Sequence, residues 1–229
     1  MNGKEYIKKE YIKIENLSKK FGEEQVLKNV NISFEQGKIH GIIGRNGSGK
    51  TMLLKAICGF IVPTSGSVTV AGRQIGRDLD FPDHTGIMLD NSGFLPYYSG
   101  FRNLSTLASI RGTATKKKIR DAIRKVGLDP SMKKHVGKYS LGMRQRLALA
   151  QAFMEDPDLL LLDEPMNGLD RHGMEEVRGM LMGLRDTGKT LLIATHIADD
   201  IKLMCDTVCE MEAGELRILR PADSSGQQL

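Results

Sequence analysis

The stretch GRNGSGKT, residues 44–51, constrains the fold of this chain more than any other part of its sequence. It fits the phosphate-loop pattern G-x-x-x-x-G-K-[ST], and an apolar segment at residues 38–43 precedes it as a candidate buried strand. Residues 51–60 are predicted to form the helix that follows. A strand, a glycine-rich loop and a helix in this order direct backbone N–H groups and a helix N-terminus at a phosphate group.

Each position of the loop has a chemical reason. Gly44, Gly47 and Gly49 allow the backbone to approach phosphate oxygens closely, and Lys50 neutralises charge on the β- and γ-phosphates. The Thr51 hydroxyl suits Mg²⁺. The alternative is a glycine-rich turn with an incidental lysine, but the flanking strand and helix favour the phosphate site. The other predicted nucleotide-binding residues of this loop are Asn46, Ser48 and Met52.

A second motif, LLLLDEP, complements the loop. The uninterrupted apolar run at residues 159–162 predicts a strand buried on both faces, and Asp163 and Glu164 follow it directly. Asp163 can hold Mg²⁺ through water, and Glu164 can orient or deprotonate an attacking water. The alternative is two acids solvated at a strand end. Residues 190–195 predict another buried strand, and His196 after it would, on its own, be a structural histidine.

The order of the remaining elements indicates the fold class. Residues 91–156 are expected to be mainly helical, and residues 173–186 and 197–205 to be helices. Strands alternating with helices predict an α/β core with a largely parallel sheet, into which residues 91–156 are inserted as a helical lobe. The expected strands of the first third are 11–15, 30–34, 38–43 and 67–70.

Charge is distributed unevenly along the chain. The formal net charge is +5, but residues 111–146 carry twelve Lys or Arg against two acids, so that segment is +10 and the rest is −5. A basic lobe of this kind could face nucleic acid, an anionic membrane leaflet or simply solvent.

The cysteines and the hydropathy of the chain indicate a reducing compartment and argue against a membrane-spanning or secreted protein. Cys58, Cys205 and Cys209 form no even framework, so we expect buried free thiols in a reducing compartment. The apolar stretches are too short for a membrane span, and the first thirteen residues carry no apolar core of a secretory signal. Any membrane role would therefore come through a partner.

The stretch YSLGMRQRLALAQAF, residues 139–153, predicts a helix with an unusual start. Ser140 and Gly142 suit a helix entrance, whereas Arg144 and Arg146 place positive charge where the helix dipole opposes it. An anion bound at this N-terminus would resolve the conflict.

Taken in order and spacing, GRNGSGKT, SLGMRQR, LLLLDEP, NGLD and ATH resemble the ATP-binding cassette (ABC) ATPases, the nucleotide-binding subunits of ABC transporters. The resemblance extends over roughly residues 10–216 and implies a P-loop NTPase core with a mainly parallel sheet, an N-terminal antiparallel β portion and the inserted helical lobe. It implies one domain, residues 1–219, with the core at 1–90 and 157–219 and the lobe at 91–156. Residues 220–229 are expected to be a disordered tail.

In this family the signature segment covers the γ-phosphate of ATP held by a second, facing subunit. The resemblance therefore implies that Ser140 and Gly142 contact a partner's nucleotide, and that two chains enclose two ATP molecules. Leu141 and Met143 stand where the family usually has Gly and Gln. Phe21 matches the aromatic residue that stacks on adenine, the alternative being a core phenylalanine.

Three further positions take their roles from the resemblance. His196 matches the switch histidine that contacts γ-phosphate and helps to position the water and Glu164. Asp170 matches the loop that crosses the dimer interface and contributes to nucleotide binding. Asp90 stands where the family usually has a Gln that touches metal and water, and exporters resembling bacitracin and lantibiotic self-protection systems carry a Glu there. The implied catalytic residues are Glu164, His196, Lys50 and Asp90, and the implied Mg²⁺ ligands are Thr51, Asp163 and Asp90.

The sequence thus predicts an ATP-hydrolysing subunit of an exporter for a peptide antibiotic or drug, using ATP and Mg²⁺. Its expected partners are a second copy, as a homodimer, and a separate membrane-spanning permease, with no nucleic acid. It would sit peripherally on the cytoplasmic side of the cell membrane. One alternative is a soluble ABC-type ATPase acting on nucleic acid or ribosomes, with which the basic lobe is compatible. Another is a nucleotide-gated module that does not hydrolyse, which only Asp90 favours.

Overall fold

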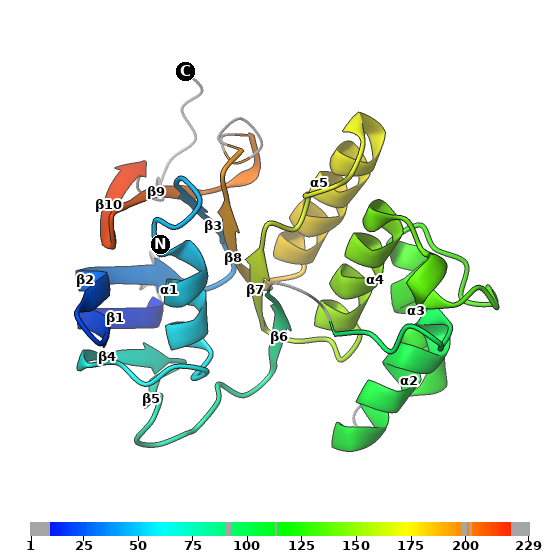
Figure 1. Cartoon of the computed structure of the whole chain (residues 1–229), viewed down its shortest axis with the longest axis horizontal. Coiled ribbons are helices and arrows are strands. Elements are labelled where there is room, and N and C mark those ends of the chain that lie inside the picture. The colour runs from blue at the N-terminus through cyan, green and yellow to red at the C-terminus, as the bar shows by residue number, and fades with distance from the viewer. Residues whose placement is uncertain (1–9, 90–92, 113, 198–200, 202, 221–229) are drawn as a thin grey trace, which may run out of the picture.

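Two β-sheets and a group of helices make up the protein (Figure 1). The computed structural model describes residues 10–89, 93–112, 114–197, 201 and 203–220. The smaller sheet is antiparallel, with strand order β2-β1-β4-β5. Its strands are β1 (Glu10–Phe21), β2 (Glu24–Glu35), β4 (Ser65–Val70) and β5 (Arg73–Gln74).

The larger sheet has strand order β10-β9-β3-β8-β7-β6 and is parallel except for the β9–β10 pair. The P-loop α/β class, with an antiparallel β portion at the N-terminal end, is therefore confirmed. Its strands are β3 (Ile39–Ile43), β6 (Thr85–Met88), β7 (Leu159–Asp163), β8 (Thr190–Thr195), β9 (Thr207–Glu212) and β10 (Glu215–Arg220).

The helices occupy both sides of the larger sheet. Helix α1 (Lys50–Ile57) lies between the two sheets, whereas α4 (Leu141–Phe153) and α5 (Arg171–Asp186) pack on the other face. Helices α2 (Gly100–Arg111) and α3 (Lys116–Lys125) gather beside α4, away from the antiparallel sheet (Figure 1). A short 3₁₀ helix, Val136–Lys138, precedes α4.

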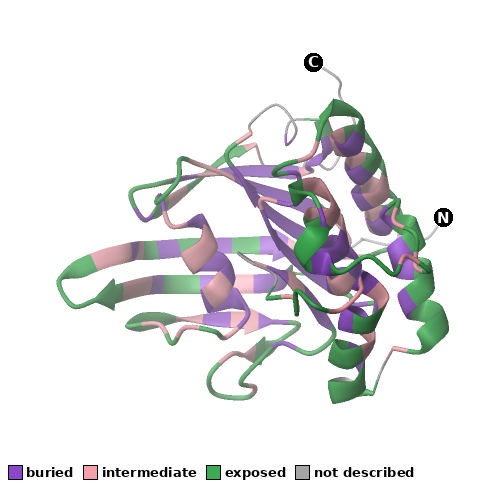
Figure 2. Ribbon diagram, turned by 45° about the vertical axis from the view of Figure 1, so that its right-hand side comes forward, coloured by how far each residue is buried: buried purple, intermediate pink, exposed green. Residues whose placement is uncertain are grey.

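Strand β7 separates two hydrophobic cores. Leu159 and Leu161 belong to the core shared with α1 and the antiparallel sheet, while Leu160 and Leu162 belong to the core shared with α4 and α5. Since successive side chains of a strand point to opposite faces, the run of four leucines is buried on both sides, as predicted. Figure 2 shows that buried residues are concentrated along the central strands of the molecule.

Strand β6 and helix α4 lie close together at Gly86. A Cβ on Gly86 would overlap the backbone carbonyl of Ala152, which no rotamer change can relieve. Glycine at this position therefore sets how near the C-terminal end of α4 lies to the sheet.

Several sequence expectations need correction. Residues 91–156 are mainly helical where described, in α2, α3 and α4, as expected, although residues 93–99 and 126–135 are not helical. Helix α1 starts at Lys50 and ends at Ile57 rather than spanning 51–60. Within the helix expected at 197–205, the described helical residues are Ile201, Leu203 and Met204. Strands β9 and β10 were not anticipated.

The three cysteines are buried and free, as expected. Cys209 lies in β9 and Cys205 precedes that strand, so the two do not share a helix face. Burial raises the pKa of the Cys58 thiol to about 11 and the pKa values of Cys205 and Cys209 to about 12. Thiols with these pKa values are protonated at neutral pH and unreactive in the folded protein.

Across the part of the chain that the structure describes, no helix combines the length and apolar character needed to cross a membrane.

Substitutions at two separate glycines, one as the test and one as the control, probe the contact between β6 and α4. Replacing Gly86→Ala should lower the free energy of unfolding by about 3 kcal/mol, because the added methyl group must push two backbones apart. The control is Gly183→Ala in α5, where an added Cβ meets nothing within 4 Å. That change should raise stability by about 0.5–1 kcal/mol through helix propensity. Urea denaturation measures both, and equal effects of the two substitutions would contradict the packing argument.

Candidate functional site

Three parallel strands end at one edge of the larger sheet and deliver the predicted site residues there. Ile43 at the end of β3 pairs with Thr195 at the end of β8, and Ala194 of β8 pairs with Asp163 at the end of β7. The phosphate loop, His196 and Glu164 follow these three strands directly, so the ladder brings them together.

The loop wraps around the Lys50 ammonium. Nζ of Lys50 donates to the carbonyl oxygens of Gly44 at 2.7 Å and Arg45 at 3.0 Å, and the residue is only 5% exposed. Gly49, immediately before α1, has φ +114°, a backbone conformation that only glycine adopts without a steric cost. The buried lysine is thus held at the N-terminus of α1, where the helix dipole and free N–H groups favour an anion.

A hydroxyl and a carboxylate meet beside the loop. Oγ1 of Thr51 donates to Oδ2 of Asp163 at 2.5 Å, and Asp163 is buried at the end of β7. Hard oxygen donors of these two types suit Mg²⁺, which keeps several of its waters and takes few protein ligands. The donor set therefore fits the ion that the sequence predicts.

Glu164 occupies the centre of the site in an unusual backbone conformation. Its φ is +48°, and its Oε2 accepts a hydrogen bond from Oγ1 of Thr195 at 2.9 Å. Its Oε1 lies 2.9 Å from Nδ1 of His196 and 3.9 Å from Nζ of Lys50. The same Oε1 is buried and accepts no well-aligned hydrogen bond from the described residues. Such an atom is placed to accept a proton or hydrogen bond from a water or substrate.

These groups line one cleft of about 550 Å³, a size that suits a small organic ligand. Ser48 also contributes a buried hydroxyl with no hydrogen-bond partner among the described residues, a second polar atom open to a ligand. The predicted residues in its wall are Asn46, Gly47, Ser48, Gly49, Lys50, Thr51, Met52, Asp163, Glu164 and His196. The residues that the sequence analysis missed are Glu24, Val26, Lys55 and Asn167.

Phe21 is not a core residue. Its side chain is 49% exposed at the end of β1, and the Lys19 ammonium lies 4.7 Å from the ring centroid. In the β1–β2 hairpin Phe21 pairs with Glu24, which lines the cleft. The ring is therefore an exposed flat surface next to the cleft, and the alternative of a core phenylalanine is wrong.

Gly44 plays a packing role that the motif did not reveal. A Cβ at this position would overlap the carbonyl oxygen of Met211 in β9 and approach Oγ of Ser48 at 2.7 Å. Its lack of a side chain thus lets the start of the loop lie against β9.

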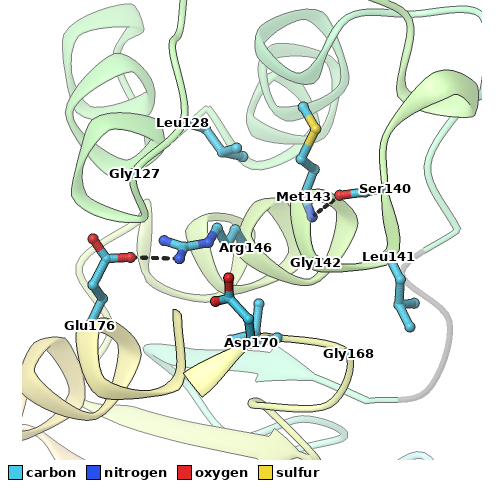
Figure 3. A pocket seen from close by; sticks show the side chains of 11 residues that line it. Gly127, Leu128, Ser140, Leu141, Gly142, Met143, Arg146, Gly168, Asp170 and Glu176 are labelled. Carbon is cyan, nitrogen blue, oxygen red and sulfur yellow. Dashed lines mark hydrogen bonds and ion pairs between the residues drawn. The ribbon is translucent and has the colours of Figure 1, made fainter. Parts of the chain in front are cut away.

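A second pocket, of about 570 Å³, forms where α4 begins (Figure 3). Ser140, Gly142 and Asp170 line it, and no phosphate-loop residue does. Ser140 caps α4, its Oγ accepting from the Met143 N–H at 3.2 Å, and Asp170 caps α5, its Oδ1 accepting from the Gly173 N–H at 2.8 Å. The structure brings these three predicted residues together, apart from Lys50.

The two arginines of this segment are satisfied within the chain. Nη1 of Arg144 donates to the Tyr139 carbonyl at 2.7 Å, and Nη1 of Arg146 donates to the Val126 carbonyl at 2.8 Å. Nη2 of Arg146 also donates to Glu176 at 2.6 Å (Figure 3), and this hydrogen bond lowers the pKa of that carboxyl group. These partners mean that the two arginines do not by themselves indicate a bound anion, and the anion site expected at this N-terminus stays a prediction.

Gln145 is a site residue that the sequence analysis missed. Its Nε2 donates to the backbone carbonyl of Glu164 at 2.6 Å, across a separation of 19 residues. A glutamine between two arginines on a helix gave no signal for this contact. Asp90, by contrast, lies outside the described residues, so its predicted contact with metal and water stays a prediction.

Comparison with known proteins identifies the family. Residues 27–167 match the ABC transporter family. The ABC transporter ATP-binding protein YybJ of Bacillus subtilis is 45% identical over 205 residues, which cover 90% of this chain and 94% of YybJ. The bacitracin transport ATP-binding protein BcrA of Enterococcus faecalis is 38% identical over 90% of this chain and 67% of its own length.

Solved structures agree with this assignment. The dimeric bacterial ABC transporter cassette MJ0796 superposes with a TM-score of 0.81 at 25% identity, covering 91% of this chain and 99% of the cassette. The same cassette in its post-hydrolysis state, bound to ADP and Pi, superposes with a TM-score of 0.80. The findings favour transport over the alternative of a soluble ATPase acting on nucleic acid or ribosomes. This chain belongs to the ABC transporter family, as an ATP-binding and ATP-hydrolysing subunit.

Proposed function

We propose that each ATP is hydrolysed between two copies of this chain. The observation that carries the proposal is the separation of the two pockets: Lys50, Thr51, Asp163 and Glu164 surround one, and Ser140, Gly142 and Asp170 surround the other. Two half-sites on one chain are completed when two chains pair head to tail. The dimeric MJ0796 cassette supports this arrangement.

The cleft of about 550 Å³ around Lys50 is called the phosphate cleft, and each of its residues has a separate role in the proposed reaction. Lys50 and the α1 N-terminus bind the β- and γ-phosphates of ATP, and Phe21 stacks on adenine. Thr51 and Asp163 would hold Mg²⁺, which neutralises phosphate charge when bound. Oε1 of Glu164 orients and deprotonates the attacking water, while His196, 2.9 Å away, holds that carboxylate and contacts the γ-phosphate.

From the partner copy, Ser140 and the α4 N-terminus cover the γ-phosphate, with Gly142 permitting close backbone approach. Asp170, at the start of α5, contributes from the loop that crosses the interface. Asp90 is proposed to touch metal and water. All these residues belong to one proposed ABC ATPase domain with the helical lobe at 91–156. The domain boundary expected at residue 219 is corrected to 220, because Arg220 ends β10 and pairs with Val208.

We propose further that the dimer powers export through a separate membrane-spanning permease, from the cytoplasmic side of the membrane. A peptide antibiotic is the class of cargo that similarity to BcrA supports. The charge of α3 is consistent with a position near an anionic leaflet: Ile119, Ala122 and Ile123 face the core, and the outer face is mainly Lys and Arg. The exposed basic residues of α3 are Lys116, Lys117, Lys118, Arg120, Arg124 and Lys125.

The assignment of Glu164 is tested by Glu164→Gln. Turnover should fall at least about 100-fold, because the amide cannot accept the proton of water, whereas ATP-dependent dimerisation should persist. Steady-state ATPase assays and size-exclusion chromatography measure the two properties. Glu215→Gln, at the exposed start of β10, is the matched control and should retain activity. Turnover of Glu164→Gln equal to that of the native protein would refute the base assignment.

The two-chain site is tested by Ser140→Arg. The large charged side chain should block closure of the dimer while leaving binding of ATP to the monomer intact, because Ser140 lies outside the chain's own phosphate cleft. Ser109→Arg on the exposed face of α2 serves as the control for added size and charge. Fluorescent-nucleotide binding at high dilution and ATP-dependent dimerisation separate the two effects. A collapse of monomer ATP affinity would contradict the proposal.

The membrane partner is tested by affinity purification from detergent-extracted membranes of the native host. The tagged chain should retain a protein with several membrane-spanning helices, and the Lys50→Met variant should retain it too, because docking does not require bound nucleotide. Recovery of ribosomal proteins or RNA in place of a spanning protein would instead favour the nucleic-acid alternative.

A further inference from the structure

We propose that Gln145 is a positioning residue for ATP hydrolysis: its side-chain amide holds the Glu164 peptide so that the carboxylate faces the attacking water. The inference rests on the proposed role of Glu164 as the base. It adds a residue to which neither the motif pattern nor the proposed function gives a role.

The backbone at Glu164 needs external support. A φ of +48° is unfavourable for a glutamate and persists only where neighbouring groups fix it. The Glu164 N–H donates to the carbonyl of Ala194 at 2.8 Å, which ties one side of the residue to β8. The other side has to be held through its carbonyl oxygen.

Two donors meet that carbonyl oxygen. The Asn167 N–H lies at 3.1 Å and belongs to the turn that follows Glu164, so it moves with the same segment. Nε2 of Gln145 lies at 2.6 Å and comes from α4. Gln145 is therefore the donor that fixes this peptide relative to a separate element.

The side-chain contacts of Glu164 do not substitute for this hydrogen bond. Thr195 ends β8 and His196 directly follows it, and both restrain the carboxylate tip of Glu164. These two contacts do not restrain rotation of the Glu164–Pro165 peptide. The hydrogen bond from Gln145 of α4 supplies that restraint. Loss of the Gln145 donor would let the peptide turn, which would misdirect Oε1 while leaving the phosphate loop in place.

The experiment compares three substitutions in the full chain. Gln145→Met keeps the length but removes the donor, and Gln145→Glu replaces the donor by an acceptor that regains a proton at low pH. Gln151→Met on the same helix is the control, since no hydrogen bond of Gln151 to the site is seen among the described residues. Glu164→Gln is measured alongside.

For Gln145→Met we expect kcat to fall about tenfold, the equivalent of one well-placed hydrogen bond, with the KM for ATP within about twofold of native. Gln151→Met should match the native protein. For Gln145→Glu the ratio of its kcat to the native kcat should rise as the pH falls from about 7 to about 5. The part-buried position facing the Glu164 carbonyl raises the pKa of the introduced carboxyl group above its ordinary value of about 4.3, and the protonated group again donates to that carbonyl. A purely structural defect would not restore activity in this way.

A native kcat in Gln145→Met, or a flat pH ratio for Gln145→Glu, would overturn the inference. If Gln145→Met fails to fold by circular dichroism, the pH ratio of Gln145→Glu decides, and failure of both to fold would assign Gln145 to the core rather than the site. The Glu164→Gln measurement separates the two hypotheses. Retained turnover there defeats the proposed base, whereas lost turnover with an active Gln145→Met defeats only the positioning role.

Discussion

Everything at the phosphate cleft depends on the parallel pairing of β3, β8 and β7. The loop, His196 and the carboxylates come from three distant parts of the sequence, and only the strand ladder brings them to one edge. A shift of one residue in β7 would replace leucine by leucine over most of the strand, but it would bring Asp158 to the place of Leu159 or Asp163 to the place of Leu162 inside a filled core. The acids at the strand ends therefore fix the register, and the register fixes the distances between the predicted catalytic groups.

Residues whose roles follow from their place beside a strand could be predicted from sequence. Lys50, Thr51, Asp163, Glu164 and His196 directly follow apolar runs or a glycine-rich turn, and in the structure all five line one cleft. The apolar run at 159–162 indicated a strand buried on both faces, because four consecutive leucines directly before two acids suit a short central strand. Local chemistry and local structure agree at these positions, so sequence is sufficient.

Contacts between elements were beyond the same reasoning. The sequence shows that Arg146 opposes the dipole of α4, but not that the Val126 carbonyl and Glu176 already surround its guanidinium group. The β9–β10 hairpin turns through Ala213 and Gly214, both with positive φ, and Ala-Gly is not among the dipeptides that indicate such turns. The exposure of Phe21 likewise depends on how the β1–β2 hairpin packs against the rest of the protein, and the sequence of the hairpin does not indicate that packing.

Helix α4 shows why such contacts matter for catalysis. Its first turn holds the Ser140 cap and Gly142 at one pocket, and Gln145, little more than one turn later, touches the Glu164 carbonyl at the other. The spacing of 1.5 Å per residue puts these two ends within about 8 Å along one rigid rod. Helix α4 is therefore one continuous element that contacts both pockets, and under the proposed role of Gln145 a shift of its N-terminus would also move the donor to the Glu164 carbonyl.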